Sequence, residues 1–68
     1  MENTVSAISL HVGQMILGNM VTSFNVADKK FGNALRLTMS PVGVDIFSKE
    51  KLVKTIPYSN IQGIDYEK

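Results

Sequence analysis

Apolar and polar side chains alternate along residues 34–47, ALRLTMSPVGVDIF. A period of two is typical of strands that bury one face. Between the two halves, Ser40-Pro41-Val42-Gly43 places proline second and glycine fourth in a four-residue turn, the preference of a type I turn. The pattern therefore predicts a β-hairpin. The side chains expected to face the core are Leu35, Leu37, Met39, Val44 and Ile46.

The first twenty residues fit two interpretations. Apolar side chains within residues 5–20 lie near helical spacing, and Asn3 or Thr4 could cap a helix. Over residues 8–12, however, apolar and polar side chains alternate. The glycines and β-branched residues of this stretch disfavour a helix. We therefore predict strands and keep the helix as the alternative.

On the strand interpretation, the hairpin is preceded by two strands and followed by two more. A first strand covers residues 5–12 and bends at Gly13 before continuing to Leu17, and a second covers residues 20–26. Proline cannot donate to a central ladder, so Pro57 should end the strand that follows the hairpin. The remaining expected segments are an exposed loop at 27–33, a charged turn at 48–51, strands at 52–56 and 61–66 with a turn between them, and a bulge or close crossing at Gly63.

Five or six short strands at regular intervals predict an all-β fold. The expected architecture is a small, partly closed antiparallel barrel of OB or SH3 type, formed by residues 1–68 as one domain. A chain of this length buries only about 60% of the surface that it exposes when unfolded. It has no cysteine for a disulfide or a thiolate metal site. We therefore expect self-association to supplement the core.

Seven Lys and Arg residues against six Asp and Glu residues leave a net charge of +1. This is too close to neutral for a strong overall attraction to nucleic acid or anionic lipid. No apolar run reaches the roughly 18 residues that span a bilayer, and the N-terminus begins acidic rather than with the basic segment of a signal peptide. We expect a cytoplasmic protein without a membrane partner, or one of the host cytoplasm or virion if its origin is viral.

The sequence shows no catalytic or metal-binding constellation. His11 is the single histidine and has no cysteine partner, so a structural role is expected. Asp45, Asp65 and Glu67 fall on strands whose alternate residues face water, where solvated carboxylates are expected. No glycine-rich segment ends in the Lys-Ser/Thr pair of a phosphate-binding loop. We predict a non-enzymatic protein without metal, cofactor or small-molecule substrate.

Basic and aromatic residues are interleaved on both sides of the hairpin. Cations that contact phosphates, with a ring that stacks on a base, are the combination that holds single-stranded nucleic acid. Asp28, Asp45 and Glu50 interrupt these clusters, so a solvated charged surface is the alternative. We favour single-stranded nucleic acid as the partner. The predicted binding residues are Lys29, Lys30, Phe31, Arg36, Lys49, Lys51 and Lys54.

Three apolar side chains fall on the polar side of the expected strands. If the hairpin buries the residues given above, Phe47 points outward, while Val21 and Val53 face away from more apolar neighbours or mark bulges. A contiguous exposed apolar patch marks an interface. The alternative function is therefore a self-assembling or docking protein, for example a viral accessory or virion component. It would bind itself or a larger protein assembly through Val21, Phe47 and Val53.

Three segments resemble the S1-type OB-fold domain, a family that binds RNA. VGQMILGNMVTSF at 12–24 is similar to the family's opening strand pair, FGNALRL at 31–37 to its third-strand motif, and GVDIFS at 43–48 to its next strand. The resemblance implies an OB fold and places Phe31 at the family's first stacking aromatic. Ala34 stands at the second aromatic position, and Ile46 replaces the family's histidine.

Overall fold

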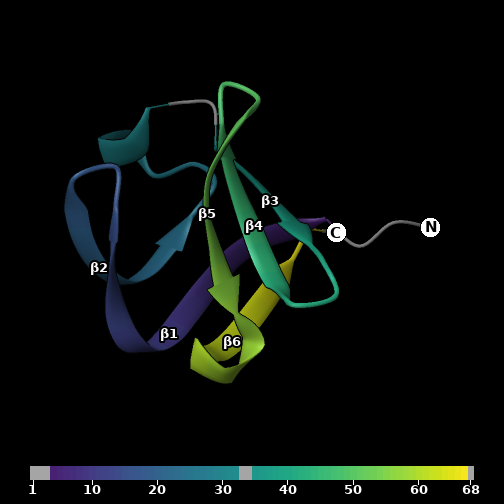
Figure 1. The fold of residues 1–68 in the computed structure, drawn as a ribbon. Coiled ribbons are helices and arrows are strands. Elements are labelled where there is room, and N and C mark those ends of the chain that lie inside the picture. Colours follow the sequence, from purple (N-terminus) through teal and green to yellow (C-terminus); the bar gives the residue numbers. More distant parts are fainter. Residues whose placement is uncertain (1–3, 33–34, 68) are drawn as a thin grey trace.

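The computed structural model describes residues 4–32 and 35–67, and it is built of strands (Figure 1). The strands are β1 (Val5–Ile16), β2 (Asn19–Asn25), β3 (Leu35–Met39), β4 (Gly43–Ser48), β5 (Lys51–Pro57) and β6 (Ile61–Tyr66), and the short 3₁₀ helices are η1 (Lys29–Phe31) and η2 (Tyr58–Asn60). The all-β prediction and the strand interpretation of the N-terminal third are confirmed. Predictions that involve Asn3, Asn33 and Ala34 lie outside the described residues.

The strands form one antiparallel sheet that is not closed into a barrel. Its order is β2-β1-β3-β4-β5, and β6 also pairs with β1. The residues from Ala7 to Ser9 pair with β2 along one edge and with β6 along the other. A single pair, Val5 with Leu37, joins β1 to β3. β1 therefore joins β2 and β6 to the β3–β4–β5 part of the sheet. It crosses behind that part in Figure 1.

The central hairpin is confirmed as β3 and β4. The Ser40 hydroxyl accepts hydrogen bonds from the backbone N–H groups of Val42 and Gly43, both at 3.3 Å, and so fixes the turn. Gly43 is required because a Cβ there would overlap the backbone carbonyl of Ile56. Met39 was expected inside but is 44% exposed, because it is the last residue of β3 and lies at the rim of the core, although its partner Val44 is fully buried.

Every strand except β6 contributes buried side chains to one apolar core. Ile61 and Ile64 of β6 are partly buried against it. The predicted irregularity at Gly63 is confirmed, because Gln62 is left unpaired between the pairs Ser9–Gly63 and Leu10–Ile61. The buried core residues are Val5, Ile8, Leu10, Ile16, Val21, Phe24, Phe31, Leu35, Leu37, Val44, Ile46 and Ile56.

Phe31, expected on the surface, is buried with 6% of its area exposed. The segment before β3 forms η1, whose first turn is capped by the Asp28 carboxylate accepting from the Lys30 N–H at 3.2 Å. This turn directs the Phe31 ring inward, where it packs edge-to-face on Phe24 with 5.8 Å between centroids. The prediction that Phe31 is presented to a nucleic acid is therefore wrong.

Val21 was expected in an interface and is also buried. Residues 10–13 of β1 stand opposite the single residue Thr22 of β2, and this irregularity shifts the phase of β2. Thr22 and Ser23 are both exposed as a result, while Val21 and Phe24 both face the core. The interface prediction for Val21 is wrong for this reason.

Val53 is the extra residue of a bulge in β5. It lies between the pairs Ile46–Lys54 and Phe47–Leu52. The bulge turns Val53 toward the core, where it is partly buried. The sequence suggested two explanations for Val53, a bulge or an outward-facing side chain. The bulge is confirmed, and the side chain is not exposed.

Two side chains cover the edge of β1 beyond the end of β6. The Asn60 amide accepts from the Val12 N–H at 2.8 Å and donates to the Val12 carbonyl at 3.1 Å, as a paired strand residue would. Farther along, the Lys54 amine donates to the Met15 carbonyl at 3.3 Å. These contacts bridge β1 to η2 and β5 without a strand. In the described part of the chain, no helix has the length and apolar character needed to cross a membrane.

Candidate nucleic-acid interface

A cation and an aromatic ring meet on the outer face of β3 and β4. Arg36 pairs with Phe47 across the hairpin, and the guanidinium carbon lies 4.5 Å from the ring centroid. Leu35 and Leu37 on either side of Arg36 are buried, so Arg36 points away from the core. Directly opposite residues share a face, so Phe47 does the same. The sequence assigned these two side chains to different surfaces, and the structure brings them together.

β5 extends this pair into a row across three strands. Phe47 pairs with Leu52, whose side chain is 58% exposed. We call Arg36, Phe47 and Leu52 the outer row. The next residues along the same face are Asp45 and Thr55, and the Thr55 hydroxyl donates to the Asp45 carboxylate at 2.5 Å. The carboxylate beside the outer row is therefore already hydrogen-bonded within the protein.

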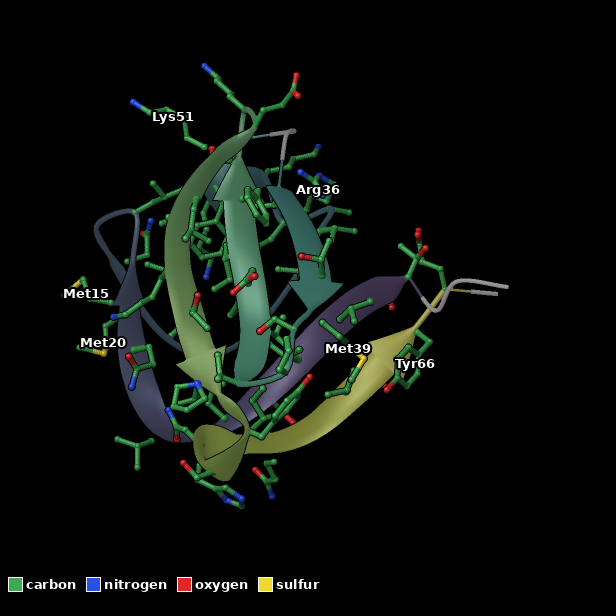
Figure 2. All side chains as sticks on the ribbon, turned by 45° about the vertical axis from the view of Figure 1, so that its right-hand side comes forward. Met15, Met20, Arg36, Met39, Lys51 and Tyr66 are labelled. Carbon is green, nitrogen blue, oxygen red and sulfur yellow. The ribbon has the colours of Figure 1, made fainter. Side chains whose placement is uncertain are left out.

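Two exposed lysines, Lys49 and Lys51, lie at the β4–β5 turn that adjoins the outer row. Lys49 and Glu50 have φ angles of 53° and 65°, so both adopt the left-handed conformation of a type I′ hairpin turn. Lys49, Glu50 and Lys51 are all exposed. Figure 2 shows Lys51 and Arg36 at the same end of the sheet. Lys51 pairs with Ser48, whose other partner is the buried Leu35, so Lys51 lies on the opposite face of the sheet from Arg36. This end therefore carries three cations against the single anion of Glu50.

Lys29 and Lys30 lie on η1, which Figure 1 places at the same end of the molecule as the β4–β5 turn. Both are exposed. The Lys30 amine lies 4.0 Å from the Asp28 carboxylate and 5.9 Å from the centroid of the buried Phe31 ring. An exposed ion pair of this kind contributes little to stability. The two lysines thus add positive charge to this end of the molecule without adding an exposed ring.

Lys54 is separated from the other predicted binding residues. Its amine is held by the Met15 carbonyl on β1, and the residue is half-buried. It therefore belongs to the contacts that bridge β5 and β1. Of the residues predicted to bind nucleic acid, the structure places Arg36 on the Phe47 ring and Lys49 and Lys51 at the adjoining β4–β5 turn.

A group of exposed apolar side chains lies around the β1–β2 turn and was not predicted from the sequence. Met15 and Met20 are directly opposite each other and are 50% and 64% exposed. Figure 2 shows them side by side, pointing away from the sheet. A signal for this group was present in the sequence. Leu17 and Gly18 lie between the two methionines and form a short turn that extends beyond the core. The exposed apolar residues of this hairpin are Val12, Met15, Leu17 and Met20.

A shallow pocket of about 460 Å³ lies on the outer face of β2, β1 and β6. Small residues such as Ala7, Ser9 and Ser23 form its floor, and Asp28 and Lys30 contribute to its lining. His11 is exposed and takes no part in it. Within residues 4–32 and 35–67, no three His, Cys, Asp or Glu side chains gather as a metal site requires.

The chain was also compared with known proteins. No protein-family model matches it, and neither a curated protein nor a solved structure is significantly similar to it. The resemblance to S1-type domains therefore stays a prediction.

Proposed function

We propose that the chain is a non-enzymatic binding module that holds single-stranded nucleic acid across the outer row. The observation that carries this proposal is the Arg36 guanidinium held 4.5 Å from the centroid of the outward-facing Phe47 ring. Aromatic rings and guanidinium planes both stack on unpaired bases. Lys49 and Lys51 at the adjoining turn supply cations for phosphate oxygens of a strand that continues past the end of the sheet, and such contacts position a strand without reading its sequence.

The shape of the surface favours a single strand over a duplex. The outer row crosses three strands, a distance of about 10 Å at the usual strand spacing. This length suits a few splayed or stacked bases. Reading a duplex in the major groove requires a helix or a projecting two-stranded ribbon. The outer row instead lies on the face of a sheet.

Phe47 takes the role that the sequence gave to Phe31. Lys29 and Lys30 then extend the cationic surface on the η1 side, while Asp28 reduces its net charge. The expected binding is weak, salt-sensitive and tolerant of base sequence, because phosphate contacts and stacking dominate it.

Fluorescence anisotropy with a labelled mixed-sequence oligonucleotide tests the proposal. For single strands, the logarithm of affinity falls with the logarithm of salt by about 0.7 for each neutralised phosphate. Contacts from Arg36, Lys49 and Lys51 predict a slope of about −2, or roughly 20-fold weaker binding at 200 mM than at 50 mM salt. Replacing both lysines, Lys49→Gln with Lys51→Gln, should reduce the slope to about −0.7.

Lys54→Gln is the matched control, because it removes one positive charge from β5 at a place outside the outer row. It should leave the salt slope unchanged. Binding by the double variant that equals wild-type binding, or wild-type binding that ignores salt, would refute the proposal.

A further inference from the structure

Three strands of the sheet have one edge that no other described strand pairs. These strands are β2, β5 and β6, each of which has a single neighbour. An unpaired edge presents a row of N–H and C=O groups and is a template for another strand. Native proteins usually block such edges with lysine, proline, bulges or inward charges.

β5 and β6 are blocked in this way. β5 carries Lys51 and Lys54, ends at Pro57, and has the bulge at Val53. β6 is interrupted by the extra residue Gln62, and it also carries the exposed Asp65 and a glycine. Either edge would therefore accept another strand only at a considerable cost.

β2 has none of these features. Its sequence, NMVTSFN, contains no charge, no proline and no glycine. The irregularity in the β1–β2 pair adds its extra residues to β1, where residues 10–13 oppose Thr22, and β2 has no extra residue, although its alternation changes at Thr22 and Ser23. The absence of charge also extends beyond the strand, since residues 4–27 contain no Asp, Glu, Lys or Arg.

The surface around this edge is apolar where β2 begins. Met20 on β2 and Met15 opposite it are each at least half exposed, and Leu17 in the adjoining turn is 47% exposed. The other end of β2 is occupied by η1, because the Asn25 carbonyl accepts from the Asp28 N–H at 3.1 Å. The accessible part of the edge therefore runs from the methionine pair to about Ser23.

The chemistry of this edge fits a second copy of the same chain. Two identical strands pair antiparallel across a two-fold axis, which brings each residue near the axis close to its own counterpart. A charge near the axis would repel its own counterpart, so an uncharged edge favours self-pairing. Complementary charges are a source of specificity for a different protein partner, and β2 carries none.

We propose that the free edge of β2 pairs with the β2 edge of a second copy of this chain, so that the two sheets become continuous. The methionine pair and Leu17 border the contact and are covered in part. This association adds to the core of a 68-residue chain that has no cysteine. It does not depend on the proposed nucleic-acid binding, because none of its residues belongs to the outer row.

Light scattering coupled to size-exclusion chromatography, without nucleic acid, tests the proposal. The wild type should approach twice the 7.5 kDa chain mass as concentration rises. Thr22 is exposed and is the middle residue of β2, so Thr22→Lys places two like charges near the axis and should give the chain mass. Gln62→Lys, an equal charge change on the β6 edge, is the control and should keep the double mass. Far-UV circular dichroism checks folding, and Ser23→Lys replaces Thr22→Lys if that variant does not fold.

Mixing distinguishes self-pairing from other effects of charge. Thr22→Glu alone should also give the chain mass, whereas an equal mixture of Thr22→Glu and Thr22→Lys should recover the double mass at low salt. A wild type that keeps the chain mass at every concentration overturns the proposal. So does a Thr22→Lys variant that stays dimeric, a Gln62→Lys variant that dissociates, or a mixture that fails to associate.

Discussion

The two ends of the main sheet path, β2 and β5, are protected in opposite ways. β5 has two lysines, a bulge and a terminal proline along its free edge. β2 has an uncharged edge with exposed methionine at its start. Both strands are seven residues long, so strand length does not explain why only one of the two edges is charged. Charge therefore lies on the edge where it opposes strand pairing and is absent from the edge where we propose that pairing occurs.

The distribution of charge also separates the surface of β1 and β2 from that of the β3–β4–β5 part. Residues 4–27 form an uncharged region built on β1 and β2, whereas most of the charge belongs to η1 and the β3–β4–β5 part. Lys51 belongs to the β5 edge and also to the β4–β5 turn that adjoins the outer row. Self-association and nucleic-acid binding would therefore use different faces and can be separated by mutation.

Removing the charges from β5 should reduce the difference between the two ends. The double variant Lys51→Thr with Lys54→Thr leaves β5 uncharged like β2, although the bulge at Val53 and Pro57 remain, so the β5 edge should accept a strand more readily than in the wild type. Open-ended assemblies well above the dimer mass are expected in light scattering. Lys29→Thr with Lys30→Thr makes the same charge change on η1 and should not produce them. A β5 variant that stops at the dimer would show that the lysines are not what protects this edge.

A methyl group at Gly43 should damage the β4–β5 pair far more than the same change damages β1 and β2. In Gly43→Ala the added Cβ would overlap the Ile56 backbone, so the strands must separate, and the free energy of unfolding should fall by about 3 kcal/mol. In Gly13→Ala the nearest atom is the flexible Met20 sulfur at 3.2 Å, and the loss should stay near 1 kcal/mol or less. Urea unfolding of both variants measures this, and equal losses would contradict it.

The bridge that joins β1 to η2 should contribute a smaller amount. Asn60→Ala removes both hydrogen bonds to the Val12 backbone, and the unfolding free energy should fall by about 1–2 kcal/mol. Ser59→Ala, at the exposed neighbouring position, should change it by less than about 0.5 kcal/mol. If the two variants unfold at the same urea concentration, the amide does not hold this edge.

The smallest expected change concerns the outer row. Arg36→Lys keeps the charge but removes the planar group over Phe47, so affinity for the oligonucleotide should fall about fivefold, or roughly 1 kcal/mol, with the salt slope unchanged. Lys51→Arg keeps its charge as well and should not weaken binding. Anisotropy titration at one salt concentration measures both. An Arg36→Lys variant with wild-type affinity would exclude stacking by the guanidinium.

Local patterns in the sequence predicted most of the fold. The alternation in the central hairpin, its proline and glycine turn, and the charged turn before β5 are short-range signals, and the structure follows them. The position of the turn also determines which residues of the hairpin pair. A turn from Ser40 to Gly43 places Arg36 opposite Phe47, which is the central pair of the outer row. That pair could have been derived from the sequence by counting back from the turn.

Phe31 and Val21 could not be placed by the same reasoning. Phe31 lies in a polar segment, and its burial depends on η1 folding the ring back onto Phe24. Val21 is buried because extra residues in β1 change the phase of β2. The burial of each residue depends on contacts with another segment of the chain. Alternation within one strand carries no information about such contacts. The free β2 edge likewise follows from strand order, which the sequence did not predict.

Amide hydrogen exchange, followed residue by residue in β2 and β5 at low and high protein concentration, tests the comparison most directly. Pairing of β2 with a second copy predicts that amides in β2 gain protection as concentration rises, most strongly around Thr22, while those of β5 do not change. Protection that is independent of concentration in both strands, or that rises in β5 instead of β2, would contradict the account.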